Sequence, residues 1–296
     1  MVTVDGLEGT RFVVAGTGRV AHALVGAFEA AGARLVGVTS RDPERARAFA
    51  DACGVPAMAD GGRFPATDAV LVLSEDGGVE SRALALAARA GPGLVWSHMA
   101  GSLPATVLAP AARLAGGGEI LAFHPLAVLD GRPRDLANVT VTLEGSAAAV
   151  GQGRTWATAL GARPVEIAGA DRHAYHLAAC LAAGHLMGVL GAARAVTEAG
   201  RLPAAVGEGL LHLAAEALAA YAAEGGRAVT GPLARGDLGT VTAHLAWLRT
   251  HAEADIRHLY GSAGLLALAA AQPASGAVEE RRASVVRRLR EDLAEP

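Results

Sequence analysis

The feature that most constrains this chain is a glycine-rich turn that directly follows a short apolar segment near the start of the sequence. Residues 11–15 are Arg-Phe-Val-Val-Ala, and the pattern G-x-G-x-x-A follows, with Gly16, Gly18 and Ala21 at its fixed positions. The next residues place apolar side chains at helical spacing. A strand, a tight turn and a helix in this order form the phosphate-binding corner of a Rossmann unit. The pattern therefore predicts a dinucleotide-binding site.

The residues of this turn are expected to bind the pyrophosphate of the cofactor. Gly16 permits the tight turn, and Gly18 lets the main chain approach the phosphates at the N-terminus of the helix. The alternative is a glycine-rich turn without a ligand, but the neighbouring strand and helix and a second strand at 34–39 favour the nucleotide site. The residues expected to contact the cofactor here are Gly16, Thr17, Gly18, Arg19 and Val20.

The end of the second expected strand distinguishes NADP from NAD. An NAD site usually has Asp or Glu at this point to accept hydrogen bonds from the ribose hydroxyls. This chain has Thr39-Ser40-Arg41 instead. A hydroxyl followed by a guanidinium suits the 2′-phosphate of NADP(H), so Ser40 and Arg41 are expected to bind it. The alternative for Arg41 is a solvated surface arginine. Asp42 is better explained as the N-cap of the next helix, with Pro43 at its first position.

Composition narrows the classes of protein to which the chain can belong. Its 296 residues, 52% of them hydrophobic, supply apolar cores for two domains. The net charge is −3 and no basic stripe is visible, so nucleic acid and anionic membranes are not expected partners. Cys53 and Cys180 lie far apart without metal-ligand spacing, and no signal peptide is recognised, so we expect a cytoplasmic protein without a metal site. The longest apolar segment, 177–193, is short for a membrane span and contains His185, which favours a buried helix.

Strand-like and helix-like segments alternate up to about residue 168 and then cease to alternate. This order predicts the α/β class, with a doubly wound parallel sheet in an N-terminal Rossmann domain over 1–168. An all-α domain over 169–296 is expected to follow and to serve substrate binding and dimerisation. The expected strands are 11–15, 34–39, 69–73, 93–97, 119–123, 138–143 and 163–167. The expected helices are 19–31, 43–53, 78–90, 103–115, 146–160, 172–198, 203–224, 237–260 and 278–293.

Polar side chains gather where several of the expected strands end. The carboxyl ends of strands in an open parallel sheet face the ligand crevice. Ser74 and Ser97 are therefore expected to contact the cofactor. His98 is a candidate proton donor, and His124 is a candidate to hold a substrate acid. The alternative for His124 is a structural histidine that is hydrogen-bonded to a loop carbonyl.

Further candidates lie at the start of the first long helix and before the third. His176 could protonate a substrate oxygen or nitrogen as hydride arrives at carbon, although a histidine satisfied by water or main chain is the alternative. Arg235 could bind a substrate carboxylate through two hydrogen bonds, and a structural ion pair is its alternative. Asp237 is most simply the N-cap of the third long helix.

In this order the segments resemble the Rossmann-like NADP oxidoreductases with a C-terminal helical domain of unknown function. That family is related to 6-phosphogluconate dehydrogenase, pyrroline-5-carboxylate reductase and ketopantoate reductase. The resemblance implies NADPH-dependent reduction of a small carboxylate-bearing substrate, most simply the C=O group of a 2-oxo acid. Imine (C=N) reduction and a non-catalytic NADP-binding protein are the alternatives. The segments that carry the resemblance are 16–21, 97–101, 124–126, 175–176 and 230–237, with His244 downstream.

One departure from the family pattern affects the expected activity. The family usually has a Ser-Asn pair where this chain has Ala183-Gly184. The loss of an amide donor implies an altered or larger substrate, or lost catalysis. His185 cannot replace it, because consecutive helical residues point about 100° apart.

The helical half also predicts a homodimer. Its helices over 177–196 and 210–221 are apolar nearly all round, and they carry more apolar surface than one chain is expected to bury.

Overall fold

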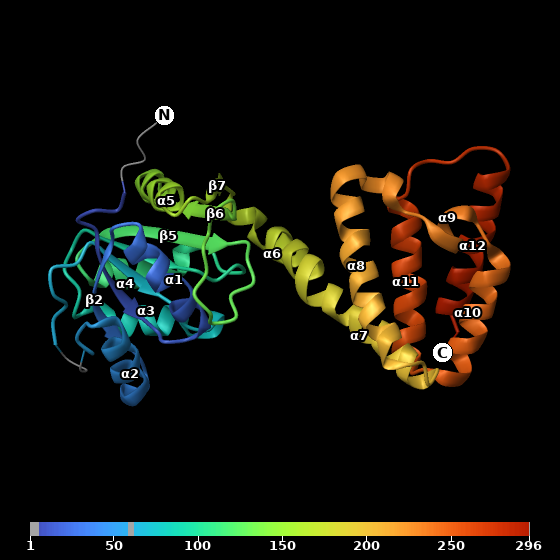
Figure 1. Ribbon diagram of the computed structural model, residues 1–296. Coiled ribbons are helices and arrows are strands. Elements are labelled where there is room, and N and C mark those ends of the chain that lie inside the picture. Colours follow the sequence, from blue (N-terminus) through green and yellow to red (C-terminus); the bar gives the residue numbers. More distant parts are fainter. Residues whose placement is uncertain (1–5, 59–61, 296) are drawn as a thin grey trace. The chain divides into compact units, whose positions relative to one another are not determined.

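The computed structural model describes residues 6–58 and 62–295. Its chain divides into two compact units, Met1–Ala179 and Cys180–Pro296, which we call the first and the second unit (Figure 1). The expected boundary after residue 168 coincides with the end of the sheet, whereas the first compact unit continues for a further helix.

A seven-stranded sheet organises the first unit, with strand order β2-β1-β3-β4-β5-β6-β7 (Figure 1). The predicted α/β class, a Rossmann sheet followed by helices, is confirmed. All neighbouring strands are parallel except β5 and β6, which are antiparallel. This pair departs from the wholly parallel sheet that the sequence predicts. Its strands are joined by residues 126–139 without a helix, whereas parallel neighbours are usually joined by a crossover that contains a helix. The strands are β1 (Arg11–Ala15), β2 (Arg34–Thr39), β3 (Ala69–Val72), β4 (Leu94–His98), β5 (Gly118–Pro125), β6 (Thr140–Gly145) and β7 (Arg163–Glu166).

The helices of the first unit follow the expected order. Asp42 caps α2 as predicted, because its carboxylate accepts hydrogen bonds from the main-chain N–H groups of Glu44 and Arg45. The α-helices are α1 (Arg19–Ala30), α2 (Pro43–Cys53), α3 (Val79–Ala87), α4 (Ala109–Leu114), α5 (Ala147–Ala159) and α6 (Arg172–Cys180). Short 3-10 turns are η1 (Asp76–Gly78), η2 (Ala105–Leu108) and η3 (Gly169–Asp171).

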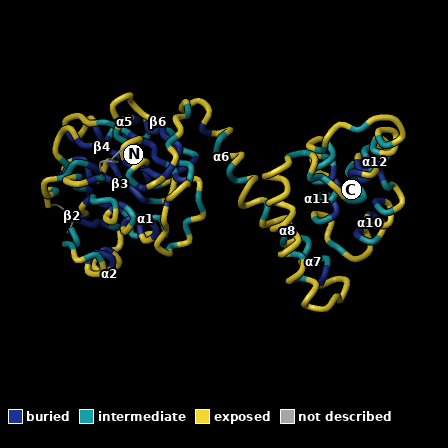
Figure 2. Tube along the Cα trace, turned by 45° about the horizontal axis from the view of Figure 1, so that its top comes forward, coloured by how far each residue is buried: buried dark blue, intermediate teal, exposed yellow. Residues whose placement is uncertain are grey.

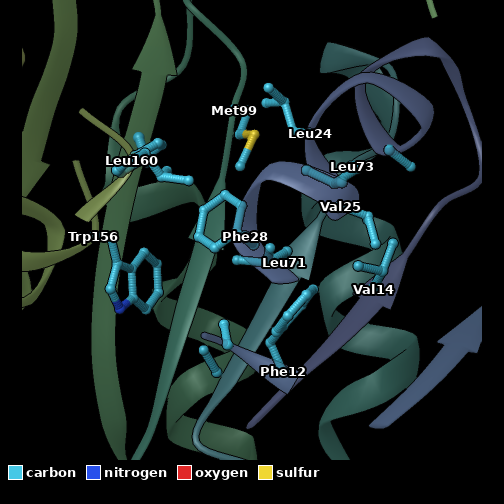
Figure 3. Packing of buried hydrophobic residues seen from close by; sticks show 14 of the residues in the cluster. Phe12, Val14, Leu24, Val25, Phe28, Leu71, Leu73, Met99, Trp156 and Leu160 are labelled. Atoms are coloured by element: carbon cyan, nitrogen blue, oxygen red, sulfur yellow. The ribbon is translucent and has the colours of Figure 1, made fainter. Parts of the chain in front are cut away.

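An aromatic cluster fixes two helices to the sheet. Phe28 of α1 lies 5.7 Å from Phe12 of β1 and 6.0 Å from Trp156 of α5, measured between ring centroids (Figure 3). All three side chains are buried. Large aromatic rings contribute much of the apolar area that stabilises a core. The cluster therefore holds α1, and with it the glycine-rich turn, in a set place on the sheet.

The second unit contains helices joined by short loops, and no strand occurs among its described residues. A one-turn π-helix, η4 (Leu181–His185), contains the Ala183-Gly184 departure. The sequence predicts one long helix over 237–260. This prediction is wrong, because the chain is extended at 252–253 and forms two helices instead. The break lets both pack on the last helix, where Leu245 of α10 and Leu289 of α12 are fully buried. The helices are α7 (Leu186–Ala199), α8 (Ala204–Glu224), α9 (Gly231–Arg235), α10 (Leu238–His251), α11 (Ala254–Ala270) and α12 (Ala277–Leu293), with the 3-10 turn η5 (Gly225–Ala228).

The two apolar helices that begin the second unit are exposed. None of the 21 residues of α8 is buried, and most of its trace is coloured as exposed in Figure 2. Among the described residues, one helical run, Gly169–Ala199, is long and apolar enough to cross a membrane by length and composition, and none of its most apolar window is buried. The expectation that 177–193 forms a buried helix is therefore wrong for a single chain. Among the described residues, this surface is thus mostly exposed.

Candidate functional site

The glycine-rich turn has the shape that a pyrophosphate requires. Gly16 has φ = +126°, and a Cβ there would lie 2.2 Å from the carbonyl oxygen of Leu73. Gly18 precedes α1 without a side-chain cap, and a Cβ there would meet nothing within 4 Å. The first N–H groups of a helix have no partner within the helix, so they face open space beside Gly18. The corner therefore fits a bound phosphate group.

Polar groups surround the end of β2. Thr39 is buried, and its hydroxyl accepts a hydrogen bond from Arg82 Nη2 at 2.7 Å. The Ser40 hydroxyl accepts a hydrogen bond from the Asp42 N–H at 3.3 Å, and Arg41 is exposed. Arg82 belongs to α3, and no motif in the sequence marks it. The end of β2 thus holds two guanidinium groups, of which the sequence indicated one.

Two serine hydroxyls are buried where their strands end. Ser74 follows β3, and Ser97 lies in β4. Within the part of the chain that the structure describes, neither Oγ atom has a hydrogen-bond partner. A buried hydroxyl without a partner loses free energy, and such a group often has a ligand or a water as its partner. Both positions suit the contact with the cofactor that the sequence predicts.

Two histidines meet at Gly101, in the loop after β4. A Cβ at Gly101 would lie 2.6 Å from His176 Cδ2 and 2.9 Å from His124 Nε2. The ring centroids of His124 and His176 are 6.4 Å apart. The structure therefore brings together two of the predicted site residues, one from β5 and one from α6.

Tyr175 joins these histidines, and sequence reasoning did not name it as a site residue. Its hydroxyl lies 2.5 Å from His124 Nδ1, and the two rings pack edge to face at 5.7 Å. The hydroxyl of Thr142, on β6, donates a hydrogen bond to the main-chain carbonyl oxygen of His124 at 3.4 Å. Tyr175 is 51 positions from His124, and it lies on α6, which follows the strands β6 and β7 that extend the sheet beyond β5. No spacing in the sequence indicates this contact.

The dyad of Tyr175 and His124 is neutral near pH 7. The pKa of His124 is lowered to about 4, mainly by burial and also by the charges of Arg172 and His176, while Asp76 acts in the opposite direction. Burial also raises the pKa of Tyr175 above its usual value of about 10. A neutral imidazole accepts a hydrogen bond at one nitrogen and donates at the other. The dyad can therefore deliver a proton without first having to bind one.

His98 has a different place from the one the sequence predicted. It is fully buried, and its Nδ1 accepts a hydrogen bond from the Ala100 N–H at 3.2 Å. Its Nε2 lies 3.2 Å from the Pro104 carbonyl oxygen and donates to it. Burial lowers its pKa to about 4. Both ring nitrogens thus bind main chain, which leaves none to protonate a substrate, contrary to the expectation.

Arg235 and Asp237 belong to the second unit. Asp237 caps α10, since its carboxylate accepts hydrogen bonds from the Thr240 N–H at 3.0 Å and the Thr240 hydroxyl at 2.7 Å. These hydrogen bonds lower the pKa of Asp237. Arg235 is exposed, and its carbonyl oxygen accepts from Arg281. The helix-cap interpretation of Asp237 is therefore confirmed.

Metal binding finds no support in the described residues. Residues 6–58 and 62–295 contain no group of three or more His, Cys, Asp or Glu side chains arranged to hold a metal ion.

The sheet, the glycine-rich turn and the polar groups at the strand ends define a Rossmann-type dinucleotide-binding oxidoreductase domain. Residues 11–89 match the family described as NADP oxidoreductase, coenzyme F420-dependent, and residues 139–266 match the domain of unknown function DUF2520. The chain is thus an NADP-dependent oxidoreductase that combines these two domains, as the sequence resemblance predicts. No curated protein matches it.

Solved structures share the fold over most of the chain. Protein BF3122 from Bacteroides fragilis is 20% identical with a TM-score of 0.72, covering 90% of this chain and 100% of that one. Protein TM1727 from Thermotoga maritima is 20% identical with a TM-score of 0.66, covering 92% and 98%. An imine reductase from Myxococcus stipitatus in complex with NADP+ is 17% identical with a TM-score of 0.59, covering 96% and 99%. At these identities the similarity shows the fold alone.

Proposed function

We propose that this protein uses NADPH to reduce the carbonyl group of a small 2-oxo acid. The observation that carries the proposal is the 2.5 Å hydrogen bond between Tyr175 and His124 beside the carboxyl ends of the strands. Reduction of a carbonyl creates an alkoxide, which needs a proton from a positioned group. A phenol that keeps its proton at neutral pH, backed by a neutral imidazole, is suited to supply it.

We assign the cofactor to the residues at the strand ends. Bound NADPH supplies the hydride. The turn holds its pyrophosphate, Ser40 and Arg41 bind its 2′-phosphate, and the hydroxyls of Ser74 and Ser97 contact the rest of it. The residues that we assign to the turn are Gly16, Thr17, Gly18, Arg19 and Val20.

We assign the proton to the cluster of Tyr175, His124 and His176 in the first unit, and Arg235 stays our candidate in the second unit for binding a carboxylate. Arg235 is exposed, and the neighbouring Asp237 is already used as a helix cap, so the guanidinium is able to bind an anion. His176 lies beside Gly101 and is the competing proton donor.

Imine reduction is the second candidate, and the charge of Asp76 favours it. Asp76 is exposed, accepts a hydrogen bond from the Ser102 hydroxyl and raises the pKa of His124. A carboxylate near the dyad would stabilise a cationic iminium, which arrives already protonated and needs no acid.

A panel of substrates tests the proposal. NADPH oxidation would be measured with 2-oxo acids, with their methyl esters and with cyclic imines of similar size. We expect turnover of the acids, loss of most turnover with the uncharged esters, and slow reaction of the imines. Faster reduction of the imines would establish the second candidate instead.

Replacing Arg41 with alanine should weaken NADPH binding by roughly 10- to 100-fold, because a charge-assisted hydrogen bond contributes about 1.5–3 kcal/mol. NADH has no 2′-phosphate, so its affinity should not change. Calorimetric titration of both nucleotides measures the difference. Arg47→Ala, at an exposed position on α2, is the matched control and should change neither affinity. Equal losses for NADPH and NADH in Arg41→Ala would remove Arg41 from the phosphate site.

We also propose that the protein is a homodimer held together by α7 and α8. The groove between these helices has a volume of about 780 Å³ and is bordered by Met187, Leu211 and Leu213, which are 57%, 61% and 57% exposed. Monomeric proteins rarely expose so much contiguous apolar surface. A second copy is the occupant that we propose, because a two-fold interface pairs the same patch with itself and two apolar patches are complementary.

The double variant Leu211→Asp, Leu213→Asp should be a monomer, because two carboxylates would have to be buried in the interface. Light scattering at micromolar concentration measures the mass. Leu266→Asp is the matched control, since Leu266 is 72% exposed on α11, and it should remain a dimer. A monomeric wild-type protein would overturn the proposal, and recovery of the wild type with lipid vesicles would identify a membrane as the partner of Gly169–Ala199.

We also propose that the protein is located in the cytoplasm. Neither described cysteine forms a disulfide, which fits the reducing cytoplasm.

A further inference from the structure

The loop Met99–Pro104, which we call the β4 loop, is held unusually firmly for an irregular segment. It joins β4 to η2 and carries Gly101, where an added Cβ would lie within 3 Å of the rings of His124 and His176. Loops commonly lie on the surface and are mobile. Three of the six residues of this loop, Met99 to Gly101, are instead buried, and side chains from three different elements bind the main chain at its two ends.

His98 holds the β4 loop from the inside. Its Nδ1 accepts from the Ala100 N–H, and its Nε2 donates to the Pro104 carbonyl oxygen, both at 3.2 Å. One ring thus connects the beginning of the loop to its end. Because the ring is fully buried, water does not compete for these hydrogen bonds.

Arg172 and Glu144 hold the same two points from the other side. Arg172 Nη2 donates to the Ala100 carbonyl oxygen at 3.1 Å. Glu144 Oε2 accepts from the Ala105 N–H at 2.6 Å and lies 3.9 Å from Arg172 Nη1. The main-chain polar groups at each end of the loop are therefore held by β4, β6 and α6 together.

Stability alone does not explain this arrangement. The Arg172 side chain is 1% exposed, and among the described residues its Nε and Nη1 have no hydrogen-bond partner. Burying a guanidinium with incomplete pairing costs free energy, and apolar residues often stabilise such a place better. This cost in free energy is explained if Arg172 has a functional role, through the position of the loop and through its own positive charge.

We propose that His98, Arg172 and Glu144 are positioning residues that lock the β4 loop, so that Gly101 fixes the rings of His124 and His176 for proton transfer. This inference rests on the proposed function. The buried charge of Arg172 has a second effect, since it adds to the burial of the His124 ring in disfavouring a proton there. The other charged or titratable groups that interact with His124 are His176 and Tyr175 on α6, Asp76 on η1 and His98 on β4.

Histidine titration of the protein without substrate tests the charge effect. NMR would follow the ring protons of His124 in the wild type, Arg172→Met, Arg172→Lys and the control Arg11→Met. Arg11 pairs with Asp68 at the start of β1, so its loss perturbs the sheet without removing charge from the site. We expect the pKa of His124, about 4 in the wild type, to rise by about one unit in Arg172→Met and to stay unchanged in the other two variants. An unchanged pKa in a folded Arg172→Met would overturn this effect.

The variant Gly101→Ala tests whether the β4 loop is held in place. It also keeps the proposal testable if Arg172→Met fails to fold. Its added methyl group forces either the rings or the loop to move. If the loop is locked, the ring signals of His124 and His176 shift while the amide signals of Ala100 and Ala105 stay. The opposite pattern would overturn the lock.

Kinetics then separate the positioning role from the proposed reaction. With a carbonyl substrate, Arg172→Met should lower kcat about 10-fold or more with little change in KM, because the acid is misplaced while binding remains. A purely structural role would lower the thermal stability alone. If no carbonyl compound reacts but the NMR results hold, the proposed function fails and the lock stands.

Discussion

Replacing Gly18 with valine should abolish NADPH binding while leaving the first unit folded. The backbone of Gly18 is extended, with φ of −85° and ψ of −173°, which valine adopts readily. A Cβ at this position meets no protein atom within 4 Å, so the branched side chain would occupy only the space that we assign to the pyrophosphate. Losing two or more charge-assisted hydrogen bonds should weaken binding about 100-fold or more. Calorimetric titration with NADPH measures the loss, and thermal unfolding checks the fold.

Gly16→Val provides the contrast. At φ = +126°, with the Leu73 carbonyl oxygen 2.2 Å from an added Cβ, this substitution strains the main chain itself. It should lower the melting temperature as well as the affinity, whereas Gly18→Val should lower the affinity alone. Submicromolar NADPH binding by Gly18→Val would remove Gly18 from the cofactor site.

The sequence predicts the sheet well because each strand has a local signature. Apolar runs bounded by turn residues mark β1 to β5, and the glycine-rich turn marks the corner where β1 meets α1. The N-caps Asp42 and Asp237 were predicted for the same reason, since a cap bonds within three residues of itself.

The contacts that sequence reasoning missed depend on the fold as a whole. Tyr175 meets His124 across 51 positions, and no local pattern encodes that contact. Arg82 reaches Thr39 across 43 positions from a helix with an ordinary pattern. The rule that strand ends face the ligand predicted where His98 lies but not the direction of its ring, which its two main-chain hydrogen bonds set.

The apolar helices show a different limit. Periodicity and composition indicate that the segment 177–193 needs to be covered, but they do not say by what. The sequence suggested burial within the chain, whereas Leu177 and Leu181 are 59% and 54% exposed. An apolar pattern indicates that a helix packs against another surface, but it does not show whether that surface belongs to the same chain.

The second large effect is expected for Tyr175→Phe, which should lower kcat by about 10²–10⁴-fold, the usual contribution of a general acid. The variant removes one oxygen and keeps the ring that packs against His124, so the NADPH dissociation constant and the melting temperature should change little. Steady-state kinetics with a carbonyl substrate, together with calorimetric titration, measure both quantities.

His176→Ala is the matched comparison, because His176 also borders Gly101 and was the donor expected from the sequence. If Tyr175 is the acid, His176→Ala should reduce kcat far less than Tyr175→Phe, and His124→Ala should approach the effect of Tyr175→Phe because it removes the partner that orients the phenol. If the loss follows His176 instead, the histidine is the donor and Tyr175 only supports His124. Wild-type kcat in both variants, with the chemical step rate-limiting, would rule out a side-chain acid. An iminium substrate, which carries its own proton to the site, would then account for the chemistry better than a carbonyl.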